Sequence, residues 1–80
     1  MWKEEHKTLT RIFEFKNFSK AFSFMTEVAI EAEKLNHHPN WSNEYNVVII
    51  NLSTHDADNT ITEKDRKLAK AIDCLLEDVG

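Results

Sequence analysis

The spacing of apolar and polar residues is typical of strands at the start of the chain and of an amphipathic helix further on. Residues 2–15 place Leu9, Ile12 and Phe13 among threonines and charged residues, with the β-branched and aromatic bias of strands. The polar stretch 4–7 has the composition of a hairpin turn, although it contains neither Asn-Gly nor Asp-Gly. We therefore expect strand structure over residues 2–15, interrupted by a turn.

Residues 19–35 have the spacing of an amphipathic helix. Apolar residues recur at every third or fourth position from Phe18 to Leu35, and mostly charged residues occupy the other side. Ser19 is the expected N-cap, because a serine side chain can accept a hydrogen bond from the first turn. The pattern also predicts that the phenylalanines of this half of the chain are core residues, namely Phe13, Phe15, Phe18, Phe22 and Phe24.

Two further strands are predicted over residues 41–45 and 47–53. The run Val47–Ile50 is more apolar than simple alternation, which is typical of a strand that is covered on both faces. Helices would supply the cover on one side, and a partner subunit would supply it on the other.

Residues 62–78 have the pattern of a closing helix. Thr62 with Asp65 three positions later resembles a capping box, and apolar residues recur from Leu68 to Val79. The predicted order is β-β-α-β-β-α. It gives one α+β domain over residues 1–80, with a four-stranded antiparallel sheet and two helices packed on one face.

Composition narrows the class of protein. The net charge of −4 argues against a direct nucleic-acid-binding face, which needs clustered lysine and arginine. No apolar run approaches the roughly 18 residues of a membrane span, and no signal-peptide core is present. The single cysteine, Cys74, excludes a disulfide framework and a paired-cysteine zinc site. We expect a cytoplasmic protein that gains buried area by forming homo-oligomers.

Three histidines point to chemistry. His37 and His38 are adjacent and precede Pro39, which keeps the preceding residue out of helical geometry, and His55 lies in a Ser-Thr-His-Asp run. Imidazole exchanges protons near neutral pH, so three such groups in a short chain suggest a proton-transfer site. Glu33, in the last turn of the helix before them, has the position to orient one ring.

Other interpretations of the same residues remain open. Three histidines can bind zinc and leave a fourth coordination position free. Alternatively, the paired histidines are turn residues and His55 is a surface residue at the end of a strand. Trp41 and Tyr45 either pack on the core or form a flat wall for a planar ring. Asp65 is also a favourable residue in the first turn of any helix.

These residues together resemble the pterin-4a-carbinolamine dehydratases. Members of that family show an acidic residue, three residues, His-His-Pro, five residues, an aromatic, nine residues, a histidine, and a downstream aspartate. The matching positions here are Glu33, His37, His38, Pro39, Tyr45, His55 and Asp65, and every spacing is satisfied. The similarity also includes residues 15–22 and the last helix, so it extends over nearly the whole chain.

The resemblance implies a lyase without metal or cofactor, which eliminates water from a 4a-hydroxytetrahydropterin to give quinonoid dihydropterin. By analogy His37 and His55 are the acid and base, while His38 positions the pterin. Asp65 and Asn36 are supporting residues. The remaining substrate-binding residues that the resemblance implies are Glu33, Pro39, Trp41, Tyr45, Thr54 and Asp56.

The resemblance also carries expectations about partners. It implies a homodimer or homotetramer with a functional link to an aromatic amino acid hydroxylase. The alternative function is a non-catalytic dimerisation or regulatory module of the same fold, since some relatives act as transcriptional cofactors. Two departures from the family are visible. Members usually carry a helix before the first strand, whereas this sequence starts near Trp2, and some have Asp where Asn36 stands here.

Overall fold

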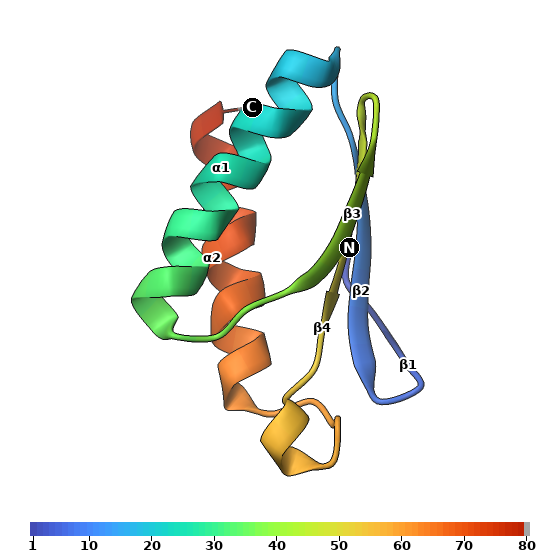
Figure 1. Ribbon diagram of the computed structural model, residues 1–80, viewed down its shortest axis with the longest axis vertical. Coiled ribbons are helices and arrows are strands. Elements are labelled where there is room, and N and C mark those ends of the chain that lie inside the picture. The colour runs from blue at the N-terminus through green and yellow to red at the C-terminus, as the bar shows by residue number, and fades with distance from the viewer. Residues whose placement is uncertain (80) are drawn as a thin grey trace.

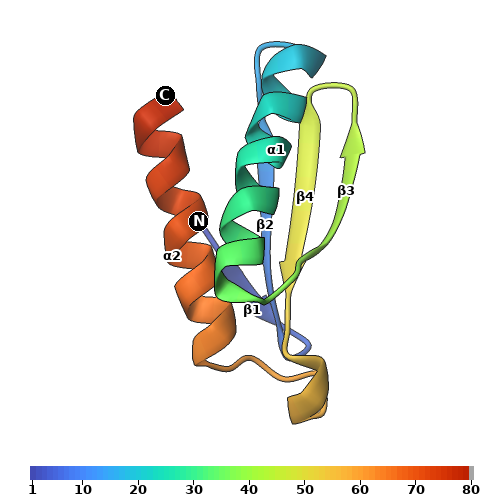
Figure 2. The same ribbon diagram turned by 60° about the vertical axis from the view of Figure 1, so that its left-hand side comes forward.

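Four strands and two long helices form two layers in the computed structural model, which describes residues 1–79 and side chains up to Leu76. The strands are β1 (Lys3–Glu5), β2 (Thr8–Glu14), β3 (Asn40–Glu44) and β4 (Val47–Leu52). The helices are α1 (Phe18–Leu35), the short 3-10 helix η1 (His55–Ala57) and α2 (Glu63–Val79). The sheet is antiparallel in the order β1-β2-β4-β3, and both long helices cover one of its faces (Figure 1, Figure 2). The predicted α+β fold and element order are confirmed.

Two tight hairpins join the strands. His6 and Lys7 both have positive φ, 50° and 64°, as a two-residue turn of type I′ requires. The hairpin turn predicted within residues 4–7 is therefore present at His6 and Lys7, although no glycine is present, and residues 4 and 5 belong to β1. At the other hairpin Glu44 pairs with Val47, so Tyr45, with φ of 50°, lies in the turn and not in the strand as predicted.

Helix α1 begins one residue earlier than predicted. Asn17 has extended geometry, and its side-chain oxygen accepts a hydrogen bond from the backbone N–H of Lys20 at 2.9 Å. This bond satisfies one of the free donors of the first turn. The prediction of Ser19 as N-cap is therefore wrong, because Ser19 is already inside the helix.

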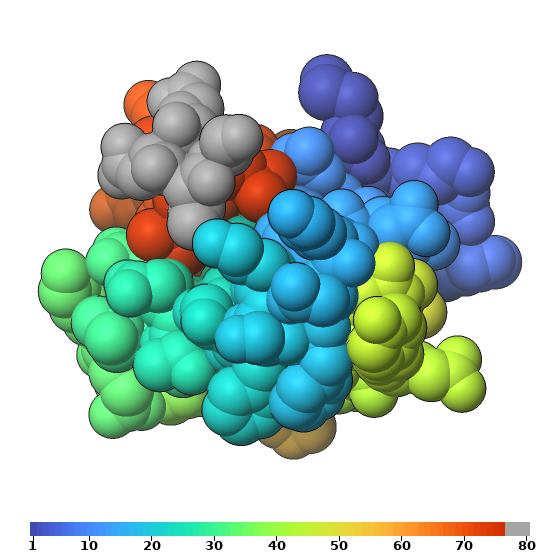
Figure 3. All heavy atoms as spheres, turned by 90° about the horizontal axis from the view of Figure 1, so that it is seen from above, coloured from blue at the N-terminus to red at the C-terminus, as the bar shows by residue number. Residues whose placement is uncertain are grey.

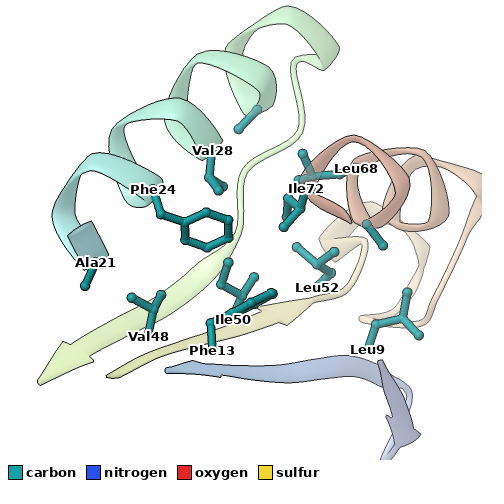
Figure 4. Close-up of a cluster of buried hydrophobic side chains, with 12 residues drawn as sticks. Leu9, Phe13, Ala21, Phe24, Val28, Val48, Ile50, Leu52, Leu68 and Ile72 are labelled. Carbon is teal, nitrogen blue, oxygen red and sulfur yellow. The ribbon is translucent and has the colours of Figure 1, made fainter. Parts of the chain in front are cut away.

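The core lies between the two helices and one face of the sheet (Figure 4). In β4 the residues alternate: Val48, Ile50 and Leu52 are fully buried, whereas the residues between them are partly exposed. Within this chain only one face of β4 is covered, so the prediction of cover on both faces is not met by its own helices. Cover by a partner subunit stays a prediction. The side chain of Val79 lies outside the described residues.

The phenylalanine prediction is right for some residues and wrong for others. Phe13 and Phe24 are buried, and Phe15 packs against the core. Phe18 and Phe22 are 47% and 55% exposed, because they lie one turn apart beside the inward-facing stripe of α1. Viewed from above Figure 1, the first turn of α1 lies next to the β3–β4 hairpin (Figure 3).

Among residues 1–79, neither long helix has the length and apolar character that crossing a membrane requires.

Candidate active site

Three segments that are distant in sequence meet at the end of the molecule opposite the β3–β4 hairpin (Figure 1). They are the connection from α1 to β3, the segment from the end of β4 into η1, and the first turn of α2. An open hollow of about 300 Å³ lies between them. Its lining consists of Asn36, His37, His38, Ser53, Thr54, His55, Asp56 and Lys64, so the three sequence-predicted histidines share one site.

The end of α1 fixes where His37 lies. Asn36 adopts the left-handed conformation (φ 52°, ψ 43°), which asparagine tolerates better than most residues. Its N–H reaches the carbonyls of Ala32 and Glu33, and the N–H of His37 donates to the carbonyl of Ala32 at 3.0 Å. This pair of hydrogen bonds is the Schellman motif, in which a helix ends at a residue in the left-handed conformation. His37 therefore follows the helix end through a hydrogen-bonded turn.

A fully buried carboxylate holds the ring of His37. Asp65 has no exposed surface, and its Oδ1 lies 2.5 Å from Nε2 of His37. Its Oδ2 accepts hydrogen bonds from the hydroxyl of Thr54 at 2.7 Å and from the backbone N–H of Thr62 at 2.9 Å. The two threonine hydroxyls are 2.5 Å apart. The predicted pairing of Thr62 with Asp65 is thus present, and Asp65 both caps α2 and positions a histidine.

These contacts determine the protonation pattern. Burial alone would raise the pKa of Asp65, but the hydrogen bonds from His37, Thr62 and Thr54 together hold it below its usual value. The carboxylate is therefore ionised at neutral pH and can only accept hydrogen bonds. Nε2 of His37 must then carry a proton, and Nδ1 is the ring nitrogen left for a ligand.

The other two histidines are held more loosely. Nε2 of His38 lies 2.5 Å from Oε2 of Glu33, but the two side chains are 58% and 76% exposed. Nδ1 of His55 lies 3.2 Å from Oδ1 of Asn59. An amide oxygen only accepts, so this contact requires a proton on Nδ1 of His55 and leaves its Nε2 free.

Most, but not all, of the sequence-predicted residues come together. Asn36, Thr54 and Asp56 line the hollow with the histidines, Glu33 reaches it through His38, and Asp65 lies behind His37. Thr54 is only 6% exposed, and its hydroxyl donates to Asp65.

The aromatic pair lies elsewhere. Trp41 is partly buried and packs against the core, as one of its two interpretations had it. Tyr45 is 63% exposed in the turn at the opposite end of β3, and the structure does not bring it to the histidines. Pro39 lies in the connection between α1 and β3 and is not among the lining residues.

Sequence reasoning missed three residues of the site. Ser53 and Lys64 line the hollow, and Thr62 completes the hydrogen bonds around Asp65. Signals were present, since Ser53 opens the Ser-Thr-His-Asp run and Lys64 directly precedes Asp65.

Over the part of the chain that the structure describes, no three His, Cys, Asp or Glu side chains are grouped so that they could hold a metal ion.

Comparison with known proteins gives consistent matches. The model of a family described as pterin 4 alpha carbinolamine dehydratase matches residues 1–75. A relative from Christiangramia forsetii is 51% identical over 76 residues, covering 95% of this chain and 77% of its own length. One from Rhodospirillum rubrum is 60% identical over 68 residues, covering 85% and 70%. Both are provisionally named pterin-4-alpha-carbinolamine dehydratase.

Two solved structures share the fold. A transcriptional coactivator/pterin dehydratase from Brucella melitensis superposes with a TM-score of 0.84 at 45% identity, covering 91% of this chain and 79% of its own. A pterin dehydratase-like protein described as a RuBisCO assembly factor in the alpha-carboxysome gives a TM-score of 0.75. It is 22% identical, with coverage of 94% and 86%, and so shows a likeness of fold alone.

Proposed function

We propose that this chain, which belongs to the pterin-4α-carbinolamine dehydratase family, eliminates water from a 4a-hydroxytetrahydropterin to give the quinonoid dihydropterin. The observation that carries the proposal is the pairing of His37 with the buried, ionised Asp65, in a hollow that two more imidazoles line. Burial of the Asp65 carboxylate is costly, and of its two oxygens only Oδ2 serves the start of α2, whereas Oδ1 is used on the ring of His37.

The reaction needs two proton transfers and no change of oxidation state. A base removes the proton on N5, and the electrons of that bond form the N5=C4a double bond. The C4a–O bond breaks with its electron pair on oxygen, and an acid protonates that oxygen so that it leaves as water. Hydroxide is a poor leaving group, so the acid matters as much as the base.

His37 and His55 are the proposed acid and base. Each keeps one ring nitrogen in an internal contact and the other free, which is what a group that exchanges one proton requires. The ionised Asp65 also stabilises the imidazolium that His37 becomes when it carries its second proton. His38, which is exposed and paired with Glu33, is the proposed pterin-positioning residue. Acid–base help of this kind contributes roughly 10²–10⁴-fold to a rate.

A dehydratase assay tests the proposal. The 4a-hydroxytetrahydropterin is generated in place, and its loss is followed with the wild-type chain, with His37→Ala, with His55→Ala and with no protein. We expect the wild type to accelerate dehydration and each variant to lose about 10²-fold or more of that acceleration. Wild-type rates in both variants would contradict the proposal. Equality of wild type and blank would instead favour the non-catalytic module of the same fold.

A further inference from the structure

Two of the three histidines of the hollow contact a carboxylate, and the third contacts a neutral amide. The third is His55, whose Nδ1 lies 3.2 Å from Oδ1 of Asn59. Asp56 and Asp58 belong to the same loop, yet among the described residues neither carboxylate pairs with this ring. Asn59 does not line the hollow, so its side chain can act on a ligand only through His55.

The loop that contains His55 and Asn59 is closed by hydrogen bonds of its own backbone. Thr54 and Thr60 form an isolated antiparallel bridge, in which the N–H of Thr54 donates to the carbonyl of Thr60 at 2.8 Å. The carbonyl of Ala57 accepts from the N–H and from the hydroxyl of Thr60, at 3.3 and 2.8 Å. These bonds join the two ends of the loop, which includes η1 at the lower end of Figure 1, and so hold His55 and Asn59 near each other.

Two consecutive residues with left-handed backbone geometry lie at the end of this loop. Asp58 and Asn59 have φ of 63° and 56°. Asparagine and aspartate adopt this geometry more readily than most residues, and glycine adopts it at no steric cost. The backbone at position 59 would therefore accept glycine at least as well as asparagine. Glycine would lack the amide oxygen that contacts His55, so the side chain of Asn59 provides a contact that the turn itself does not require.

An amide oxygen fixes the position of the proton on a neutral imidazole. Oδ1 of Asn59 only accepts, so Nδ1 of His55 must carry the proton and Nε2 keeps its lone pair. A free histidine side chain prefers the opposite tautomer, with the proton on Nε2, and a hydrogen bond at one ring nitrogen decides between the two. A hydrogen bond between neutral groups changes such a ratio by about fivefold. This change is large enough to reverse a small intrinsic preference.

The tautomer determines what His55 can do in the dehydration. When Nε2 is unprotonated, the neutral ring can accept a proton from a ligand in the hollow. When Nε2 is protonated, the only lone pair of the ring is on Nδ1, which faces Asn59 in the loop. Because the amide is neutral, Asn59 sets the tautomer without the negative charge that Asp65 brings to His37.

We propose that Asn59 is a positioning residue, whose amide oxygen holds the proton of His55 on Nδ1 and keeps Nε2 as a proton acceptor for the hollow. The catalytic consequence rests on the proposed function, whereas the position of the proton does not. The two parts can therefore be measured separately, one by spectroscopy and the other by kinetics.

Nitrogen NMR of the chain labelled with ¹⁵N-histidine measures the tautomer, because protonated and unprotonated ring nitrogens have widely separated chemical shifts. The signals of His55 are assigned by their absence in His55→Gln, at a pH where the ring is neutral. We expect Nδ1–H to predominate in the wild type. Asn59→Gly, which keeps the turn and removes the acceptor, should shift the ratio toward Nε2–H by about fivefold. Asn59→Asp, which keeps an acceptor, should retain the wild-type tautomer.

Dehydration kinetics test the consequence for the reaction. Asn59→Gly should lower kcat about threefold and leave KM within about twofold of wild type, since fewer molecules carry an unprotonated Nε2. Asn59→Asp should recover most of kcat. Asp58→Gly is the matched control, because it places a glycine at the neighbouring left-handed position and leaves the contact between Asn59 and His55 intact. This control should change neither the tautomer nor kcat.

The outcomes distinguish the role of Asn59 from the proposed function. A wild-type proton on Nε2 of His55, the same tautomer ratio in wild type and Asn59→Gly, or an equal shift in Asp58→Gly would overturn the role of Asn59. A shifted tautomer with unchanged kcat would overturn its part in the reaction. A shifted tautomer in a chain that does not dehydrate the pterin would support the placement of the proton and contradict the proposed enzyme activity.

Discussion

His37 and His38 are neighbours in sequence, and each has a carboxylate oxygen 2.5 Å from its Nε2, yet their surroundings are opposite. The His37 side chain is 11% exposed and its partner Asp65 is fully buried. His38 and Glu33 are both more than half exposed. The comparison shows that distance alone does not determine what a charged contact contributes. Water and salt screen the exposed pair, whereas removing one partner of a buried pair leaves an uncompensated polar group.

The two environments suit two tasks. His37 is held in one protonation pattern by Asp65, which itself is fixed by Thr54 and Thr62. A group that transfers a proton benefits from such preorganisation, because its orientation does not have to be established during the reaction. His38 is free to adjust to a ligand, because exposed side chains reorient on the nanosecond scale.

The largest expected effect comes from truncating the buried carboxylate, Asp65. Asp65→Ala should lower the free energy of unfolding by about 3–5 kcal/mol, because the buried His37 ring, the Thr54 hydroxyl and the capped N–H all lose their partner. Glu33→Ala, the matched exposed control, should cost less than about 1 kcal/mol. Urea denaturation of the two variants measures both values. Similar losses in the two would show that burial does not separate the pairs.

A smaller effect is expected one step behind the carboxylate. Thr54→Val keeps the shape of the side chain but removes the hydroxyl that donates to Asp65, and should cost about 1–3 kcal/mol. Thr54→Ser retains the hydroxyl and should recover most of the stability and of the dehydration rate. Equal losses of stability in Thr54→Ser and Thr54→Val would show that the hydroxyl does not stabilise the position of Asp65.

Lowering the pH should reduce the contribution of the buried Asp65 carboxylate to the free energy of unfolding. The pKa of Asp65 is lowered on folding from its ordinary value of 3.8, so its contribution to stability is complete above that value. This contribution is lost as the pH falls through the lower folded value. Urea denaturation at a series of pH values from 6 downward should show a loss of stability below about pH 4 that is smaller in Asp65→Asn. Identical pH profiles in both proteins would indicate that Asp65 is not the group responsible.

Local patterns were sufficient to predict the fold. The periodicities predicted both helices and the sheet, and the hairpin at residues 4–7 formed without its usual residues. The prediction erred where two neighbouring residues compete for one role. Asn17 and Ser19 are both good N-caps, and the choice between them depends on which residue adopts extended geometry. Phe18 and Phe22 fit the helical spacing but lie beside the buried stripe, which only the packed structure shows.

The site was predictable as a set of residue types but not as an arrangement. His37, His38 and His55 were assigned to one cleft, and they line one hollow. What the sequence did not reveal is the interior side of the site, where the hydroxyl of Thr54, a residue that also lines the hollow, donates to Asp65. The direction of Thr54 depends on the alternation of side chains at the end of β4 and on where α2 packs.

The central claim is that the buried carboxylate, and not the exposed one, prepares its histidine for proton transfer. The most direct measurement is kcat for dehydration of a generated 4a-hydroxytetrahydropterin by Asp65→Asn and Glu33→Gln, with circular dichroism to verify that both are folded. We expect Asp65→Asn to lose about 10²-fold or more in kcat, because an amide no longer stabilises the imidazolium of His37. Glu33→Gln should remain within about threefold of wild type. Equal rates in the two variants, or a larger loss in Glu33→Gln, would contradict the claim.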